Sequence, residues 1–76
     1  MKRAERLFTI YKLLKVKSRT IQQLLLHFKN NGVEVSERQL QRDVIALIEL
    51  VDDKQESMIV ETQSNNKKIY SISVRH

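Results

Sequence analysis

The chain has 76 residues and no cysteine, so we expect one small domain with neither a disulfide bond nor a thiolate metal site. Lysine and arginine number 14 against 9 aspartates and glutamates, and the resulting net charge of +5 favours a polyanionic partner. No apolar run approaches the roughly 18 residues of a membrane span, and the charged N-terminal segment argues against a secretory signal, so we expect a cytoplasmic protein with no membrane partner.

The first predicted helix covers residues 2 to 16, where apolar side chains recur at helical spacing. Phe8 and Leu13 widen this stripe, as expected for a helix wedged between other elements. The polar surface is almost entirely cationic, which fits phosphate contacts as well as it fits a solvated face. The stripe itself consists of Ala4, Leu7, Ile10, Tyr11 and Leu14.

A second helix is predicted over residues 20 to 30, because Thr20 and Gln23 have the spacing of a capping box. Arg19, directly before it, is a candidate phosphate contact. Leu26 falls nearly opposite the apolar face, where it is either an ordinary exposed leucine or a docking point for a partner. The apolar face consists of Ile21, Leu24, Leu25 and Phe28.

A short turn with the only glycine, Gly32, leads to a third predicted helix over residues 36 to 51. Two helices joined in this way, the second with a polar outer face, are typical of a helix-turn-helix. Ser36 and Gln39 form the capping box of the third helix. Its predicted core face consists of Leu40, Val44, Leu47, Ile48 and Val51.

The opposite face of this third helix carries Arg38 and Arg42. Arginine reads guanine and glutamine reads adenine with paired hydrogen bonds in the DNA major groove. The pattern therefore favours a DNA-reading helix, although many solvated helices share its basic surface. The flanks of the face carry Gln39, Gln41, Ile45 and Ala46.

The remainder of the chain is predicted to form a β-hairpin over about residues 57 to 75. A solvated polar turn at 52–57 comes first; its two aspartates lack the neighbours of a metal or acid–base site. Residues 69–74 alternate with period two and place Tyr70, Ile72 and Val74 on one side. The hairpin loop at 63–68 carries Lys67 and Lys68 at its tip, where they could contact the DNA backbone.

The segment Ser36-x-Arg38-x-Leu40-x-Arg42-Asp43-Val44, with Arg6-Leu7 upstream, resembles the N-terminal DNA-binding domain of bacterial WYL-domain regulators, which are similar to DeoR-type repressors. The resemblance implies that Arg38, Gln41 and Arg42 contact DNA. Asp43 would repel phosphate if it faced DNA, so we expect it to have a structural role and to orient either Arg3 or Arg6. Gln39 stands where the family usually has threonine. Such regulators continue into a ligand-sensing module, so the chain is either an excised domain or a small stand-alone DNA binder.

These features predict an α+β fold, a winged helix-turn-helix over residues 1–76 with three helices followed by a two-stranded hairpin wing. We expect sequence-specific binding of double-stranded DNA in a bacterial transcriptional regulator, a repressor, that acts as a homodimer on DNA. We expect no cofactor, metal or catalytic residue. The candidate DNA contacts are Ser36, Arg38, Gln39, Gln41, Arg42, Arg19, Lys67 and Lys68.

Two alternatives remain open at this point. The first is a winged helix used as a protein-interaction or dimerisation module, with Leu26 and the first helix as contacts. The second is an RNA-binding basic domain. It is weakened because all four aromatic residues occupy expected core positions and leave no platform for stacking unpaired bases.

Overall fold

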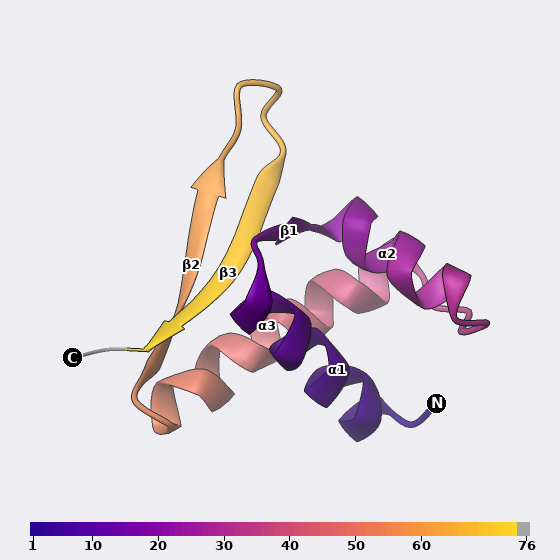
Figure 1. Ribbon diagram of the computed structural model, residues 1–76, viewed down its shortest axis with the longest axis horizontal. Helices are drawn as coiled ribbons and strands as arrows, with labels where there is room; N and C mark the ends of the chain where they lie inside the picture. The colour runs from indigo at the N-terminus through magenta and orange to yellow at the C-terminus, as the bar shows by residue number, and fades with distance from the viewer. Residues whose placement is uncertain (75–76) are drawn as a thin grey trace.

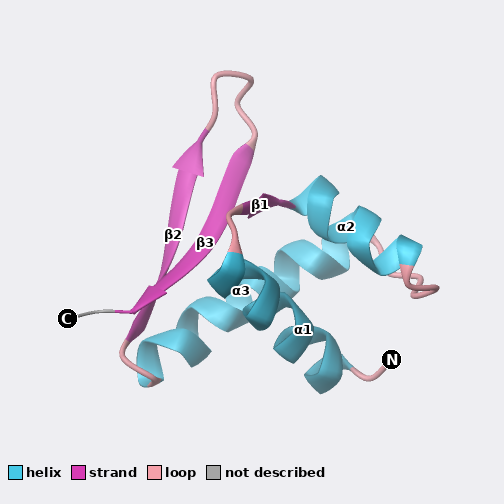
Figure 2. Cartoon of the chain, viewed as in Figure 1, coloured by secondary structure: helices cyan, strands magenta, loops and turns pink. Residues whose placement is uncertain are grey.

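The computed structural model describes residues 1–74, which form three helices and a three-stranded antiparallel sheet (Figures 1 and 2). This confirms the predicted α+β class, and each helix lies within two residues of its predicted bounds. The elements in chain order are α1 (Arg3–Val16), β1 (Arg19–Thr20), α2 (Ile21–Asn30), α3 (Glu37–Asp53), β2 (Glu56–Thr62) and β3 (Lys68–Val74).

Both predicted capping boxes are present, and they fix where α2 and α3 begin. The hydroxyl of Thr20 accepts a hydrogen bond from the backbone N–H of Gln23 at 3.2 Å, and the Gln23 amide oxygen accepts from the Thr20 backbone at 2.9 Å. Such reciprocal bonds satisfy N–H groups that have no partner within the helix. After α2, Gly32 adopts a φ of +74°, a conformation that side chains disfavour, and turns the chain toward α3.

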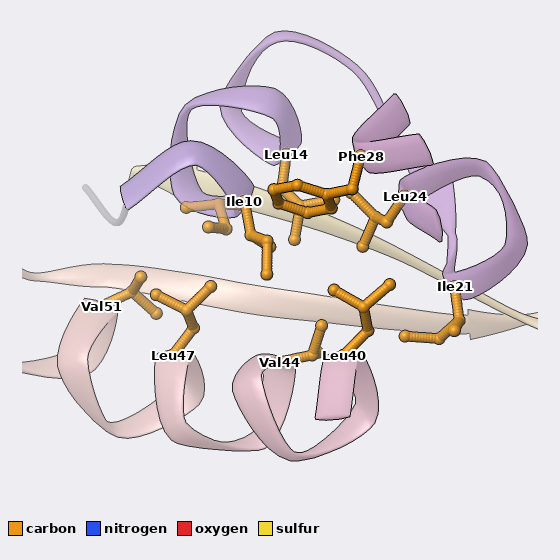
Figure 3. Close-up of a cluster of buried hydrophobic side chains, with 10 residues drawn as sticks. Ile10, Leu14, Ile21, Leu24, Phe28, Leu40, Val44, Leu47 and Val51 are labelled. Atoms are coloured by element: carbon orange, nitrogen blue, oxygen red, sulfur yellow. The ribbon is translucent and has the colours of Figure 1, made fainter. Parts of the chain in front are cut away.

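The core lies where α1 and α2 pack on one face of α3 (Figure 3). The predicted stripes of the three helices supply most of it, and β3 adds Ile72. Val33 and Val35, from the turn between α2 and α3, pack against its edge. The buried apolar residues are Ile10, Leu14, Ile21, Leu24, Phe28, Leu40, Val44, Leu47, Val51 and Ile72.

The prediction of a two-stranded wing is wrong in one respect, because the sheet has a third strand. The strand order is β1-β3-β2, with Arg19 opposite Tyr70 and Thr20 opposite Ile69. Thr20 must be extended to cap α2, and this extended backbone pairs with β3. A two-residue strand is too short to show an alternating pattern, so it left no signal in the sequence.

Three residues predicted to face the core are exposed instead, namely Ala4, Phe8 and Ile48. Phe8 on α1 is 57 % exposed, and Val74, on the same side of its strand as Tyr70 and Ile72, also reaches solvent. For Ile48 the reason is that α1 and α2 cover only one side of α3, so the buried stripe of this helix is narrower than the apolar pattern suggests. The exposed Phe8 also corrects the expectation that all four aromatic rings lie in the core.

The predicted polar turn at 52–57 is also corrected. Helix α3 continues through Asp53, and Glu56 is buried at the start of β2. Tyr11 donates a hydrogen bond to Glu56 Oε1 at 2.6 Å, and Lys15 Nζ lies 2.8 Å from Glu56 Oε2. The contact with Lys15, followed by the hydrogen bond from Tyr11, lowers the pKa of Glu56. The contact with Glu56, followed by that with Tyr11, raises the pKa of Lys15. These contacts join α1 to the sheet.

The β2–β3 hairpin extends away from the three helices (Figure 1). Its strands pair from Glu56 opposite Val74 to Thr62 opposite Lys68, so Lys68 belongs to β3 rather than to the loop. At the tip, Gln63 donates a backbone hydrogen bond to Lys67 at 2.8 Å, and Asn66 takes a φ of 64°. Residue 75, the last of the predicted wing, lies outside the described residues.

Candidate nucleic-acid interface

The N-terminal end of α3 is held by a side-chain cap rather than left open. Ser36 Oγ accepts from the backbone N–H of Gln39 at 3.1 Å. Gln39 Oε1 accepts from the Ser36 backbone at 3.0 Å and lies 3.3 Å from the Ser36 hydroxyl. The amide oxygen of Gln39 is thus engaged within the protein. Both side chains are exposed, but their shared role in this geometry is to start the helix.

Arg38 and Arg42 project from the first turns of α3 on its solvent side, one turn apart. Both are exposed, and neither forms an ion pair or a hydrogen bond within residues 1–74. Gln41 lies beside them on the same exposed surface. Two guanidinium groups in solvent keep all their donors available for paired hydrogen bonds to an anion or a base edge.

The arginines at the start of α1 are arranged differently. Asp43, only 1 % exposed, accepts hydrogen bonds from Arg6 Nε to Oδ2 and from Arg6 Nη2 to Oδ1, the latter at 3.3 Å. Arg3 Nε approaches Asp43 Oδ1 at 3.4 Å from a largely exposed position. The hydrogen bond to Asp43 raises the pKa of Arg6. The sequence left open whether Arg3 or Arg6 contacts Asp43, and in the structure both arginines do.

A groove of about 560 Å³ separates the outward side of α3 from the β2–β3 hairpin. It brings Gln41 together with Lys67 and Lys68, three of the predicted DNA contacts that come from distant parts of the sequence. The N-terminal end of α2 closes the groove. Its lining consists of Ile21, Gln22, Glu37, Gln41, Ile45, Ile48, Val60, Asn66, Lys67, Lys68 and Tyr70.

Several residues of this groove were not predicted from the sequence as DNA contacts, Ile45 and Glu37 among them. Ile45 is 65 % exposed and lies on the outward stripe of α3 two turns after Arg38. Its signal was available, because it falls on the opposite side from the core stripe. Glu37 accepts a hydrogen bond from Gln22 Nε2 at 3.1 Å and joins α3 to α2. That contact links positions 15 residues apart and has no local pattern.

Arg19 lies in a different place from the other predicted contacts. It lines a hollow of about 260 Å³ on α2, together with Lys17, Gln23 and His27. Arg19 Nε is buried and has no hydrogen-bond partner among the described residues. The structure does not bring Arg19 into the groove of Gln41, Lys67 and Lys68. Leu26 lines the same hollow and is exposed, as expected from its position opposite the apolar face.

Within residues 1–74, no group of three or more His, Cys, Asp or Glu side chains is arranged to hold a metal ion. None of the described helices combines the length and the apolar character that crossing a membrane requires. Comparison of the chain with protein-family models, curated proteins and solved structures gives no match.

Proposed function

We propose that this protein is a winged helix-turn-helix that binds double-stranded DNA in a bacterial transcriptional regulator, acting as a repressor. Helix α3 enters the major groove and the β2–β3 hairpin is the wing. The observation that carries the proposal is the pair of exposed arginines, Arg38 and Arg42, one turn apart on the outward face of α3 and without ionic partners in residues 1–74.

The contrast with Asp43 supports this assignment. Where the fold needs an arginine for itself, at Arg6 and Arg3, it provides a buried carboxylate. Within residues 1–74, Arg38 and Arg42 have no such partner. Two exposed guanidinium groups match the paired acceptors of guanine and of phosphate.

The two walls of the groove beside α3 carry different side chains, which supports different roles for them in DNA binding. Gln41 and Ile45 lie on its helix wall, and Lys67 and Lys68 on its hairpin wall. A helix wall with defined side-chain geometry suits base edges, whereas lysines on a hairpin suit the phosphate backbone. The resemblance of residues 36–44 to WYL-domain regulators leads to the same assignment. One recognition helix reads few base pairs, so we propose that two copies bind adjacent half-sites.

The test is a titration of the 76-residue protein against duplex DNA selected from a random pool, at several salt concentrations. We expect the binding constant to fall with salt as it would if the protein neutralised about 4–7 phosphates. In a plot of its logarithm against the logarithm of the salt concentration, each phosphate contributes roughly −0.9 to the slope. Replacing Arg38 and Arg42 together by alanine should abolish preference for the selected duplex. The control variant, Lys29→Ala, removes an exposed cation from the last turn of α2, outside the groove beside α3, and should leave this preference unchanged.

An affinity that does not change with salt would exclude the proposal, because phosphate contacts always release counterions. Equal loss of preference in the Lys29→Ala control would show that the effect follows net charge rather than the outward face of α3. If the affinity does not change with salt, the alternative, a protein-interaction module, takes precedence. That alternative also draws on a specific feature, an apolar groove on another side of the molecule.

A further inference from the structure

A second groove, of about 260 Å³, runs between α1 and the C-terminal half of α3. Apolar side chains make up nearly all of its surface. We name it the α1/α3 groove. It is lined by Ala4, Leu7, Phe8, Tyr11, Leu47, Leu50, Val51 and Lys54.

The rims of the α1/α3 groove carry large apolar side chains that reach solvent. Phe8 projects from α1 with 57 % of its surface exposed, and Leu50 projects from α3 with 48 % exposed. The groove therefore offers both a hollow and two projecting side chains next to it. A surface with a hollow and projections of matching chemistry can pack against its own copy across a two-fold axis.

The charges on α1 have the same self-complementary order. Glu5 lies three residues before Phe8 and Lys12 four residues after it, on the exposed side of the helix. Glu5 forms no ion pair within residues 1–74, and the ammonium group of Lys12 lies 4.7 Å from the centre of the Phe8 ring. If two copies of α1 cross antiparallel near Phe8, Glu5 of each faces Lys12 of the other.

We propose that the α1/α3 groove is a homodimer interface, in which a second copy of this chain packs with its α1 antiparallel to the first. Phe8 and Leu50 of each copy enter the groove of the other, and two Glu5–Lys12 pairs border the contact. Burial of the apolar rims drives association, and the charge order selects the antiparallel arrangement. The proposal concerns a surface distinct from the outward face of α3 and does not depend on DNA binding.

The order of Glu5 and Lys12 on α1 is what favours a second copy as the occupant. Glu49 and Asp53 are exposed on the last turns of α3 but do not line the groove, and the charged residue that does line it is Lys54. An identical chain supplies apolar side chains for the hollow, a cation for Glu5 and a carboxylate for Lys12.

The first test measures the association of the 76-residue protein without DNA, by sedimentation over concentrations from micromolar to millimolar. We expect a monomer–dimer equilibrium. Leu50→Ala should weaken it by about tenfold or more, since each dimer loses two buried leucine side chains. The matched control is Leu26→Ala, the same substitution at a leucine that is 55 % exposed on α2, and it should leave association unchanged. A protein that stays monomeric throughout this range, or equal effects of the two substitutions, would overturn the proposal.

The second test uses charge reversal at Glu5 and Lys12, both exposed, so each variant is first checked for unchanged thermal unfolding. Glu5→Lys and Lys12→Glu should each weaken self-association, because they place like charges opposite each other. Mixed in equal amounts, the two variants should form a heterodimer about as strong as the unmodified dimer. A mixture that associates no better than either variant alone would overturn the antiparallel arrangement. Neither measurement involves DNA, so failure of this inference and failure of DNA binding remain separate results.

Discussion

The guanidinium of Arg6 on α1 donates to both carboxylate oxygens of Asp43 on α3. This contact crosses 37 residues of sequence and joins the first helix to the middle of the proposed reading helix. Because the carboxylate is almost completely buried, the charge of Asp43 is stabilised only while its arginine is present. The pair therefore links the first turns of α1 to α3.

We expect Arg6→Ala to lower the free energy of unfolding by about 3–5 kcal/mol, because it leaves a buried carboxylate without its main partner. Asp43→Ala should also destabilise, but the double variant should be more stable than the sum of the single effects predicts. Arg3→Ala is the control, since Arg3 contacts the same carboxylate from solvent, and it should cost less than about 1 kcal/mol. Urea unfolding measures all four; equal costs for Arg3 and Arg6 would contradict this account.

The Glu56 cluster predicts a dependence of stability on acid pH. Lys15, followed by Tyr11, lowers the pKa of Glu56 in the folded protein. The stabilisation that the charged Glu56 gives the fold is therefore fully present above the ordinary glutamate pKa. It is lost progressively as pH falls from about 4.3 through the lowered pKa. We expect Glu56→Gln to be less stable than the unmodified protein at pH 7 and to show a shallower loss toward acid pH. Thermal unfolding at a series of pH values measures this, and parallel curves for the two proteins would count against it.

The helices and their caps were predictable because their determinants are local. Thr20 with Gln23 and Ser36 with Gln39 lie three residues apart, and the apolar stripes repeat over one or two turns. The same holds for the exposed positions of Arg38 and Arg42, which follow from their distance to the core stripe. Each of these signals can be read from a window of a few residues.

The features that were missed depend on pairings between distant segments. Strand β1 exists because Thr20, extended as a cap, meets Ile69 of β3. Glu56 is buried because Tyr11 and Lys15, more than 40 residues away, lie above it. Phe8 and Ile48 look like core residues by periodicity alone, and only the placement of α1 and α2 shows which side of each helix stays uncovered.

Ile45 should act on DNA through thymine methyl groups, which are the apolar feature of the major groove. We expect Ile45→Ala to weaken binding to a selected duplex by about 0.8 kcal/mol or more per buried methyl contact. Replacing thymine by uracil at the contacted position should cost the unmodified protein a similar amount, and the Ile45→Ala variant almost nothing. If the losses caused by Ile45→Ala and by replacing thymine with uracil simply add, Ile45 does not contact a thymine methyl group.

The hairpin lysines should contribute affinity without sequence preference. Lys67→Ala combined with Lys68→Ala should weaken binding to selected and scrambled duplexes by the same factor, and should make the salt dependence shallower by about one to two phosphates. Titrations of both duplexes at three salt concentrations measure this. A change in preference between the two duplexes would mean that the hairpin reads bases.

Whether α3 reads DNA sequence through its outward face is tested by the affinity of Arg42→Ala for one selected and one scrambled duplex at matched salt. We expect a loss of about 1–3 kcal/mol on the selected duplex and a much smaller loss on the scrambled one, because paired hydrogen bonds to a base carry discrimination. Equal losses on both duplexes would contradict base reading by Arg42 and make it a phosphate contact.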